Sequence, residues 1–330
     1  MSMKLGFFAA NYAHLSVEEV AKIASSNGFE MLEIPAYIGN GQLDCDEILA
    51  GNNAKKLKDM LKSYDLGISG LSNHADSLLI LGPHTEDTDT LYKGTKEEKV
   101  KYGIDSLLKT AQTANALEVP VVNGFTGVTN WGRYFPFPCA NGWRETEEEF
   151  AEVFTPILNK FKEYGVKFAV EPHPNNFIYD IHTAKKAIEL VDHHPCLGFN
   201  LDPANIMATG GVLVENFIDE LGDRIFHVHA KDAEVVEHNV QRGGIMMQGD
   251  WQRLDRAFRF RIPGWGDVKW KKVITELSMV GYQGTLSYEH EDVTMSVGDG
   301  VEKVSTYLKP LLIKAPYEGR KDKIFNNPMG

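Results

Sequence analysis

Short apolar runs alternate with longer amphipathic stretches along almost the whole chain. Residues 4–8 read KLGFF, which is typical of a buried strand, and residues 16–28 read SVEEVAKIASSNG, with apolar positions spaced as on one helix face. Ser16 and Glu19 have the spacing of a helix-capping box, and Gly28 is a typical helix stop. The first 28 residues therefore predict a strand followed by a helix.

The same strand–helix unit recurs along the chain. Strands are predicted at 4–8, 29–34, 67–74, 119–125, 166–173, 196–202, 224–232 and 284–291. Helices are predicted at 16–28, 53–67, 96–117, 145–164, 182–192, 214–221, 267–279 and 297–312. Strands alternating with helices indicate a parallel sheet, and eight such units fit a closed barrel better than an open doubly wound sheet. We therefore predict an α/β protein with the (β/α)8 TIM-barrel fold.

The predicted barrel is a single domain over residues 1–313 with two long insertions in its βα loops. Residues 125–143 form an aromatic loop, which either stacks on a sugar ring or packs between subunits. Residues 233–260 form an insertion over the barrel mouth, either a lid or an oligomer contact. The polar tail 314–330 is expected to wrap the surface of this or a neighbouring subunit, so we expect a homo-oligomer.

Composition and charge exclude several classes of protein. The 330 residues carry 34 Lys+Arg and 46 Asp+Glu, so the formal net charge is −12 and a nucleic-acid partner is not expected. No apolar run approaches the roughly 20 residues of a membrane span, so no membrane partner is expected either. Three widely spaced cysteines argue against a disulfide framework and favour a cytoplasmic protein.

Residues of the kind that bind metals lie at the ends of four consecutive predicted strands. They are Glu171, Asp202, His229 and Glu289. The carboxyl ends of the strands meet at the mouth of such a barrel, so we expect these side chains to surround one point. Three carboxylates and one imidazole suit one divalent ion; we expect Mn²⁺, with Mg²⁺, Co²⁺ or Zn²⁺ as alternatives.

Five segments of the chain resemble a known family. AVEPHP, FNLDPANI, FHVHAKD, RIPGWGDVKW and SYEHED occur in this order between residues 169 and 292. With them the chain is similar, over roughly residues 4–312, to the xylose-isomerase-like barrels of the sugar phosphate isomerase/epimerase family. That group includes ketose 3-epimerases, inosose dehydratases and isomerases, and more distantly endonuclease IV.

The resemblance implies roles for individual residues. Glu171, Asp202, His229 and Glu289 would be the metal ligands, and Glu171 and Glu289 would also be the acid/base pair that moves a proton. Arg261 would contact substrate oxygens, although Arg259 could take that role instead; the alternative is that Arg261 pairs with surface carboxylates.

Further residues are candidates for contact with a sugar substrate. Lys231 shares a strand face with His229 and either is a solvated cation or contacts the substrate or Glu289. His173 is expected to contact the substrate or a carboxylate, and His74 either contacts the substrate or is a loop histidine. Asn205 stands where the epimerases and endonuclease IV have a histidine; it can hydrogen-bond a hydroxyl but is a poor ligand for a second metal.

These residues predict a divalent-metal-dependent isomerase or epimerase acting on a ketose, keto-inositol or oxidised sugar through an enediolate. The alternatives are an inosose-type dehydratase and a lyase that cleaves 3-oxo-glycosides, including C-glycosides. An AP-endonuclease-like nuclease and a non-catalytic sugar-binding barrel are less favoured. No Gly-rich phosphate cradle follows strands seven or eight, which favours an unphosphorylated sugar.

Overall fold

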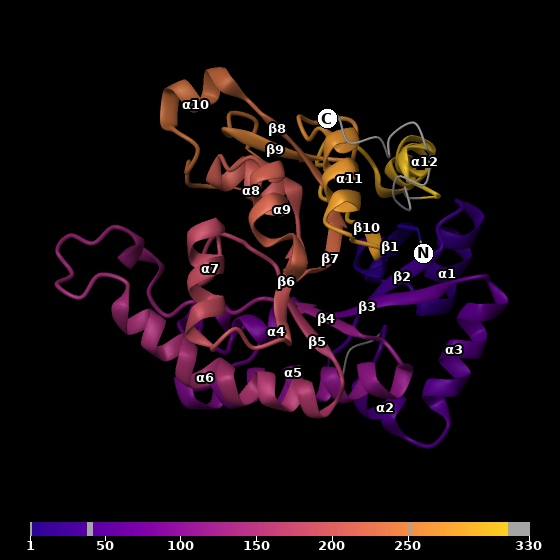
Figure 1. Ribbon diagram of the computed structural model, residues 1–330, viewed down its shortest axis with the longest axis horizontal. Helices are drawn as coiled ribbons and strands as arrows, with labels where there is room; N and C mark the ends of the chain where they lie inside the picture. Colours follow the sequence, from indigo (N-terminus) through magenta and orange to yellow (C-terminus); the bar gives the residue numbers. More distant parts are fainter. Residues whose placement is uncertain (1, 38–41, 251–252, 316–330) are drawn as a thin grey trace, which may run out of the picture.

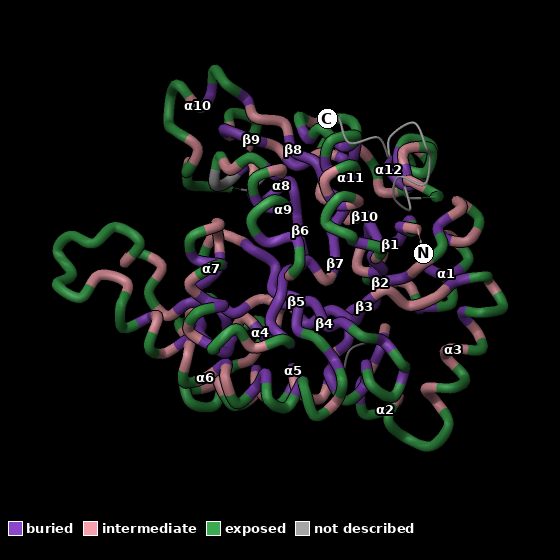
Figure 2. Tube along the Cα trace, in the orientation of Figure 1, coloured by how far each residue is buried: buried purple, intermediate pink, exposed green. Residues whose placement is uncertain are grey.

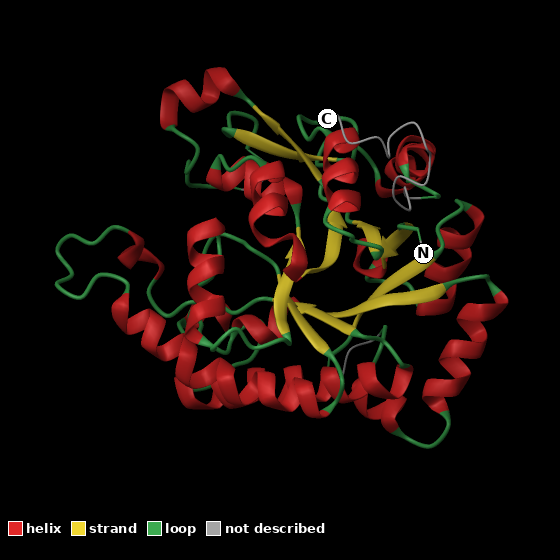
Figure 3. Cartoon of the chain, viewed as in Figure 1, coloured by secondary structure: helices red, strands yellow, loops and turns green. Residues whose placement is uncertain are grey.

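A closed barrel of parallel strands, surrounded by helices, makes up the centre of the protein (Figure 1, Figure 3). The structure is a computed structural model that describes residues 2–37, 42–250 and 253–315. The barrel strands are β1 (Lys4–Phe8), β2 (Met31–Pro35), β3 (Gly67–Asn73), β4 (Val121–Gly124), β5 (Lys167–Val170), β6 (Leu197–Leu201), β7 (Ile225–Ala230) and β10 (Thr285–Tyr288). They follow one another in this order around the barrel, and β10 closes it by pairing with β1. The predicted TIM barrel is confirmed.

A long helix follows each barrel strand and covers its outer face (Figure 1). These helices are α1 (Val17–Ser26), α3 (Asn53–Ser63), α5 (Lys96–Leu117), α6 (Arg144–Glu163), α7 (Ile181–Leu190), α9 (Val214–Leu221), α11 (Trp270–Met279) and α12 (Val297–Leu308). Further helices in the described part of the chain are α2 (Cys45–Leu49), α4 (His74–Leu78), α8 (Pro203–Gly210) and α10 (Glu237–Gly243). The 3-10 turns are η1 (Ala9–Tyr12), η2 (Glu86–Thr88), η3 (Trp131–Tyr134), η4 (Gly222–Arg224) and η5 (Lys309–Leu311).

The eight helices that cover the barrel strands are those that the apolar spacing predicts. The helices α2, α4, α8 and α10 were not predicted, because one or two turns carry little periodicity. The capping box at the start of α1 is present: the Glu19 amide donates to Ser16 Oγ, and the Ser16 amide donates to Glu19 Oε2. Among the described residues, no helix combines the length and the apolar character needed to cross a bilayer.

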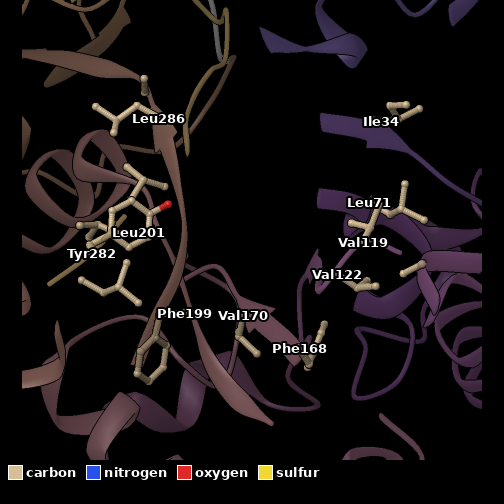
Figure 4. Close-up of a cluster of buried hydrophobic side chains, with 14 of the residues drawn as sticks. Ile34, Leu71, Val119, Val122, Phe168, Val170, Phe199, Leu201, Tyr282 and Leu286 are labelled. Carbon is tan, nitrogen blue, oxygen red and sulfur yellow. The ribbon is translucent and has the colours of Figure 1, made fainter. Parts of the chain in front are cut away.

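Apolar side chains on the outer faces of the strands form the main core. Neighbouring residues of a strand point to opposite sides of the sheet. The outward positions are buried against the helices, as Figure 4 shows for Leu71, Phe168, Phe199 and Leu286. Figure 2 shows the barrel strands as the most deeply buried part of the chain.

Many inward positions of the same strands carry small or polar side chains instead. Buried polar residues on the barrel strands or directly after them include Glu33, Ser72, Asn123, Glu171, Asn200, Asp202, His227, His229, Lys231 and Ser287. Buried polar groups are stable only when they are hydrogen-bonded or paired. The barrel interior is therefore a connected polar layer, and this layer reaches the mouth where the strands end.

The segment after β7 folds into structure that the sequence did not predict. Strand β8 (Asp232–Val235) pairs with β9 (Phe258–Arg261) in an antiparallel hairpin, with α10 between them. We expected strand seven to run to residue 232, but β7 ends at Ala230 because the chain enters this hairpin. Phe258 and Phe260 pack against α8, so the insertion 233–260 is joined to the barrel mouth by an apolar contact (Figure 1).

The expectation for the tail 314–330 lies almost wholly outside the described residues, which end at 315.

Asp232 ties the hairpin to the turn that follows it. Its Oδ1 accepts the amides of Ala233 and Val268 at 2.8 and 3.0 Å. Its Oδ2 accepts the amide of Gly264 and the Trp270 indole N–H, both at 2.9 Å. Asp232 is fully buried, and three of its four donors belong to the buried residues Ala233, Val268 and Trp270, so these N–H groups depend on this one carboxylate.

We predict that Asp232→Ala lowers the free energy of unfolding by about 3 kcal/mol or more, because it leaves several buried N–H groups without an acceptor. Urea unfolding followed by circular dichroism measures this change. The matched control is Asp223→Ala, whose side chain is 84% exposed and which should change stability by no more than about 0.5 kcal/mol. Equal unfolding midpoints for the two variants would contradict the role given to Asp232.

Candidate active site

Four side chains from different strands meet at the carboxyl ends of the barrel strands. Glu171 follows β5, Asp202 follows β6, His229 lies near the end of β7 and Glu289 follows β10. One ligand-type atom from each of them lies within 4.8 Å of the others. The structure thus brings together the four residues that the sequence places at consecutive strand ends.

His229 is oriented by a buried carboxylate behind it. Its Nε2 lies 3.0 and 3.1 Å from the two carboxylate oxygens of Glu33. Its Nδ1 lies 3.0 Å from Glu171 Oε2 and 3.1 Å from Glu289 Oε2, yet forms no hydrogen bond of acceptable geometry within the described part of the chain. When Nε2–H donates to Glu33, the Nδ1 lone pair faces the carboxylates, as in a metal-ligating histidine with a carboxylate behind it.

The charge of Glu33 and the charge of His229 depend on each other. Burial opposes ionisation of Glu33, but the nearby His229 and His227 outweigh it and lower the pKa of Glu33 to about 2. Burial likewise opposes a charged imidazole at His229, but the surrounding carboxylates raise its pKa well above the usual value. The carboxylates therefore require a positive charge at this position, which either a proton on His229 or a cation among the four ligands supplies.

Glu171 is held on both of its oxygens. Asn205 Nδ2 donates to Oε1 at 2.7 Å, and Asn200 Nδ2 donates to Oε2 at 3.0 Å. His74 Nε2 also lies 3.1 Å from Oε2. Burial opposes ionisation of Glu171, but the neighbouring histidines outweigh it and hold its pKa well below the usual range. Glu171 is thus a fixed, ionised carboxylate.

Asp202 caps helix α8 with one oxygen and faces the cluster with the other. Its Oδ1 accepts the amides of Ala204 and Asn205 at 2.8 and 3.3 Å. Its Oδ2 accepts from Asn205 Nδ2 and lies near Lys231 Nζ, at 2.8 Å in each case. Burial, with the neighbouring carboxylates, raises the pKa of Asp202 to about 7 although the Lys231 charge lowers it.

Lys231 is buried among carboxylates and is not a solvated surface cation. Its Nζ lies 2.8 Å from Asp202 Oδ2, 2.9 Å from Glu289 Oε2 and 2.8 Å from Glu291 Oε2. The ammonium also lies over the Phe260 ring, 4.5 Å from its centroid. Burial lowers the pKa of Lys231, but the carboxylates outweigh it and raise that pKa well above the usual value. The sequence left Lys231 either as a solvated cation or in contact with the substrate or Glu289, and the structure shows the contact with Glu289.

Glu289 is the most accessible of the four. Its side chain is 16% exposed, against 4% for Glu171 and 0% for Asp202 and His229. Burial opposes its ionisation, but Lys231 and His229 outweigh it and lower the pKa of Glu289 to about 2. Its carboxylate lies near His229 and Lys231, whereas the Glu171 carboxylate accepts hydrogen bonds from two side-chain amides.

Three other candidates lie around the cluster. His74 contacts Glu171 and packs edge-on against Phe125, with ring centroids 4.8 Å apart. His173 also lies against Phe125, and its Nδ1 bonds the Pro174 carbonyl at 2.7 Å. The described contacts of His173 do not include a carboxylate. Both histidines therefore form part of the wall beside Glu171.

Arg261 lies on β9 and is tied to acidic side chains at the rim. Its Nε donates to Asp292 at 2.9 Å, and Nη1 donates to Glu234 at 3.1 Å. Arg259 also donates to Glu234 at 3.1 Å. No described contact joins Arg261 or Arg259 to the four-residue cluster, so a substrate contact by either arginine stays a prediction.

The aromatic loop 125–143 packs mainly on the side of α6 and α7. Trp143 stacks on Phe177 with centroids 5.8 Å apart. Phe135 and Phe137 are 61% and 79% exposed, and Figure 2 shows this loop reaching away from the barrel. The structure leaves both readings of the loop, substrate stacking and subunit contact, as predictions.

Sequence reasoning missed Glu33, Asn123 and Asn200, which support the cluster from inside the barrel, whereas His227 was expected to pack there and does so. Glu33 accepts from Asn123 Nδ2 at 2.7 Å as well as facing His229. His227 Nδ1 lies 3.1 Å from Asn200 Oδ1, which connects it to Glu171. Burial lowers the pKa of His227 to about 4, so it is neutral near pH 7. The available signal was the presence of Glu, Asn and His at alternate positions of otherwise apolar strands.

Proteins with related sequence or structure share this barrel. The uncharacterized protein YfiH of Bacillus subtilis is 24% identical over 320 residues, covering 93% of this chain and 98% of YfiH. The probable 3-DHS dehydratase AsbF of Bacillus anthracis has a TM-score of 0.66 at 17% identity, covering 93% of this chain and 99% of AsbF.

Two further solved structures are similar. The IolI protein, solved with a bound zinc atom, has a TM-score of 0.66 at 16% identity, covering 94% of this chain and 98% of IolI. The 3-keto-D-glucoside 4-epimerase YcjR of E. coli has a TM-score of 0.61 at 16% identity, covering 92% of this chain and 99% of YcjR. At these identities the likeness establishes the fold alone.

Residues 21–311 match the family described as the xylose isomerase-like TIM barrel. This match spans most of the chain, including all four strand-end residues. The chain therefore belongs to the xylose isomerase-like TIM-barrel family.

Proposed function

We propose that this protein is a divalent-metal-dependent sugar isomerase or epimerase that acts on a ketose, keto-inositol or oxidised sugar. The observation that carries the proposal is the cluster of Glu171, Asp202, His229 and Glu289, in which the Nδ1 of His229 faces carboxylates while its Nε2 is bonded to Glu33. Such a set of one imidazole and three carboxylates has the donor chemistry of a metal site.

The four residues would hold one divalent ion. Carboxylate oxygens with one imidazole favour Mn²⁺, with Mg²⁺, Co²⁺ or Zn²⁺ as alternatives, and the bound zinc of IolI supports metal binding in this fold. When bound, the ion would supply Lewis acidity that polarises a substrate carbonyl and its neighbouring hydroxyl.

Glu171 and Glu289 are proposed as the acid/base pair. Both are ionised, and they approach the cluster from strands β5 and β10, which lie on different sides of β7. The carboxylate that takes the proton from the carbon beside a carbonyl becomes a carboxylic acid and can return that proton to the adjacent carbon of the enediolate, which gives isomerisation. Inversion at the same carbon requires that the other glutamate has first taken up a proton, which it then delivers to the opposite face. Glu289 is the better candidate for the glutamate whose carboxylate shifts position during proton transfer. Its side chain is more exposed, whereas Glu171 accepts hydrogen bonds from two side-chain amides.

Other residues around the four-residue cluster set the charge of Glu289 and limit the access of water. Lys231 favours the ionised form of Glu289, which is the form that accepts a proton. Phe8 lies against the His229 ring with centroids 5.3 Å apart, and Phe125 lies against His74. These apolar faces reduce the access of water to the cluster. His74, His173, Asn205, Lys231 and Arg261 remain proposed substrate contacts.

A dehydratase or lyase is the second candidate. Removal of the same proton leads to β-elimination when the next carbon bears a hydroxyl or a glycosyl group. The fold likeness to the dehydratase AsbF supports an inosose-type dehydration, and cleavage of a 3-oxo-glycoside follows the same chemistry.

We also propose a cytoplasmic location and a homo-oligomer. The cysteines Cys45, Cys139 and Cys196 are all free thiols, as suits a reducing compartment. The exposed Phe135 and Phe137 of the aromatic loop offer apolar surface for a second copy.

We predict that Glu289→Gln lowers kcat by about 10²–10⁴-fold, because an amide cannot accept the proton. The assay tests ketoses, inososes and 3-oxo-glycosides with Mn²⁺ and with chelator, in deuterated water, and follows turnover and deuterium at the carbon beside the carbonyl. Glu302→Gln, an exposed substitution on α12, is the control and should leave turnover unchanged. Unchanged turnover in Glu289→Gln would refute the proton-transfer role.

We predict that Glu33→Gln weakens Mn²⁺ binding by about 10–100-fold, because Glu33 orients His229 and increases its basicity. Calorimetric titration of the metal-free protein with MnCl₂ measures the affinity. Glu30→Gln changes an exposed glutamate three residues earlier and should bind Mn²⁺ like the parent protein. If both variants bind Mn²⁺ with the parent affinity, Glu33 has no role in the site.

A further inference from the structure

A second pocket lies beside the cluster, between the β8–β9 insertion and the loop after β10. Its volume is about 310 Å³. Phe258 and Phe260 supply aromatic lining, and Arg253, Arg256 and Arg259 supply three guanidinium groups. The lining of the pocket includes one acidic residue, Glu291, whose carboxylate lies 2.8 Å from Lys231 Nζ.

The pocket is connected to the candidate active site through Lys231. Two of the lining residues, Phe260 and Glu291, contact the Lys231 ammonium directly. The same ammonium lies 2.9 Å from Glu289 Oε2. The pocket and the four-residue cluster therefore adjoin one another at the Lys231 ammonium.

The arginines are held in place by their surroundings. Arg253 makes a two-point ion pair with Asp255, at 2.7 and 2.8 Å. Arg256 donates to the main-chain carbonyls of Gly249 and Asp250, and its guanidinium lies 5.5 Å from the Phe258 ring centroid. These contacts orient the guanidinium groups at the pocket before any ligand binds.

Arg259 has further N–H groups that can bind an anion. Its described hydrogen bond uses Nη1 alone, with Glu234, which it shares with Arg261. A guanidinium carries five N–H donors in a planar fork, so Arg259 can bond a further anionic oxygen. The lining thus carries three guanidinium groups and one carboxylate, and two of the guanidinium groups are paired with acidic residues outside the lining, Asp255 and Glu234.

We propose that this pocket binds an anionic group, a carboxylate or a phosphate, carried by the sugar that reacts at the four-residue cluster. The proposal rests on the proposed function and narrows its substrate class to acidic sugars. Guanidinium groups recognise carboxylate and phosphate oxygens through charge-assisted, often bidentate hydrogen bonds. The sequence favoured an unphosphorylated sugar because it lacks a Gly-rich cradle; the pocket instead offers side-chain donors from a hairpin that was not predicted.

The test compares probes that differ at one end of the same keto-hexose: D-fructose, D-fructose 6-phosphate and D-fructuronate. Calorimetry measures the affinity of these probes for the 330-residue protein, once loaded with Mn²⁺ and once with chelator. We expect the phosphate or the carboxylate probe, or both, to bind at least about tenfold more tightly than fructose. The two anionic probes show which of the two groups is preferred.

The variant Arg256→Gln/Arg259→Gln should reduce this preference to about twofold or less, because it removes two guanidinium groups. Arg242→Gln, an exposed substitution on α10 of the same insertion, should retain the preference. If the double glutamine variant unfolds, Arg256→Lys/Arg259→Lys decides the matter. That variant keeps the charge but loses the planar fork, so the preference should fall severalfold.

Equal affinity for fructose and both anionic probes would overturn the proposed anion site. The proposal would also be overturned if neither anionic probe binds at about 10 mM. If chelator abolishes the preference for an anionic probe over fructose but the arginine variants retain that preference, the anion binds the metal. This result would also overturn the proposed anion site. Anion binding that depends on the arginines, in a protein that turns over no sugar, would contradict the proposed function and leave the pocket standing.

Discussion

The pairing of His229 with Glu33 inside the barrel is the interaction on which the site depends. Both side chains are buried, and an isolated charge there would be costly. The contact of Nε2 with Glu33 sets the plane of the imidazole and turns Nδ1 toward Glu171 and Glu289. Without it, the histidine would be free to rotate away from the carboxylates that require its charge or that of a cation.

The rest of the polar interior extends the same principle. Asn200 lies between His227 and Glu171, and Asn205 joins Glu171 to Asp202. Most of these connections join residues that follow or lie on different strands, so the barrel must be closed before the network is complete. Asn200 and His227 lie on strands, Asn205 lies on α8, and Glu171 and Asp202 directly follow β5 and β6, so the supporting residues are held by regular elements. Glu289 is the most exposed of the four cluster residues, which suits a group that has to move a proton.

Much of this arrangement could be predicted from the sequence. The alternation of apolar runs and amphipathic stretches predicts the barrel, and strand ends in a barrel share one mouth, so the meeting of Glu171, Asp202, His229 and Glu289 follows from topology. Glu33 was missed because a lone glutamate in a strand gives no indication of which distant residue it faces. The β8–β9 hairpin was missed because its strands are four residues each and are separated by 22 residues of other structure. Contacts such as those of Arg261 with Asp292 and Glu234 depend on side-chain packing, which residue spacing does not encode.

Anomalous scattering from crystals grown with MnCl₂ shows where the metal binds. We expect one manganese peak bonded to Glu171, Asp202, His229 Nδ1 and Glu289. A peak at another place, or Mn²⁺-soaked crystals in which His229 Nδ1 still faces the carboxylates with no metal between them, would contradict the account.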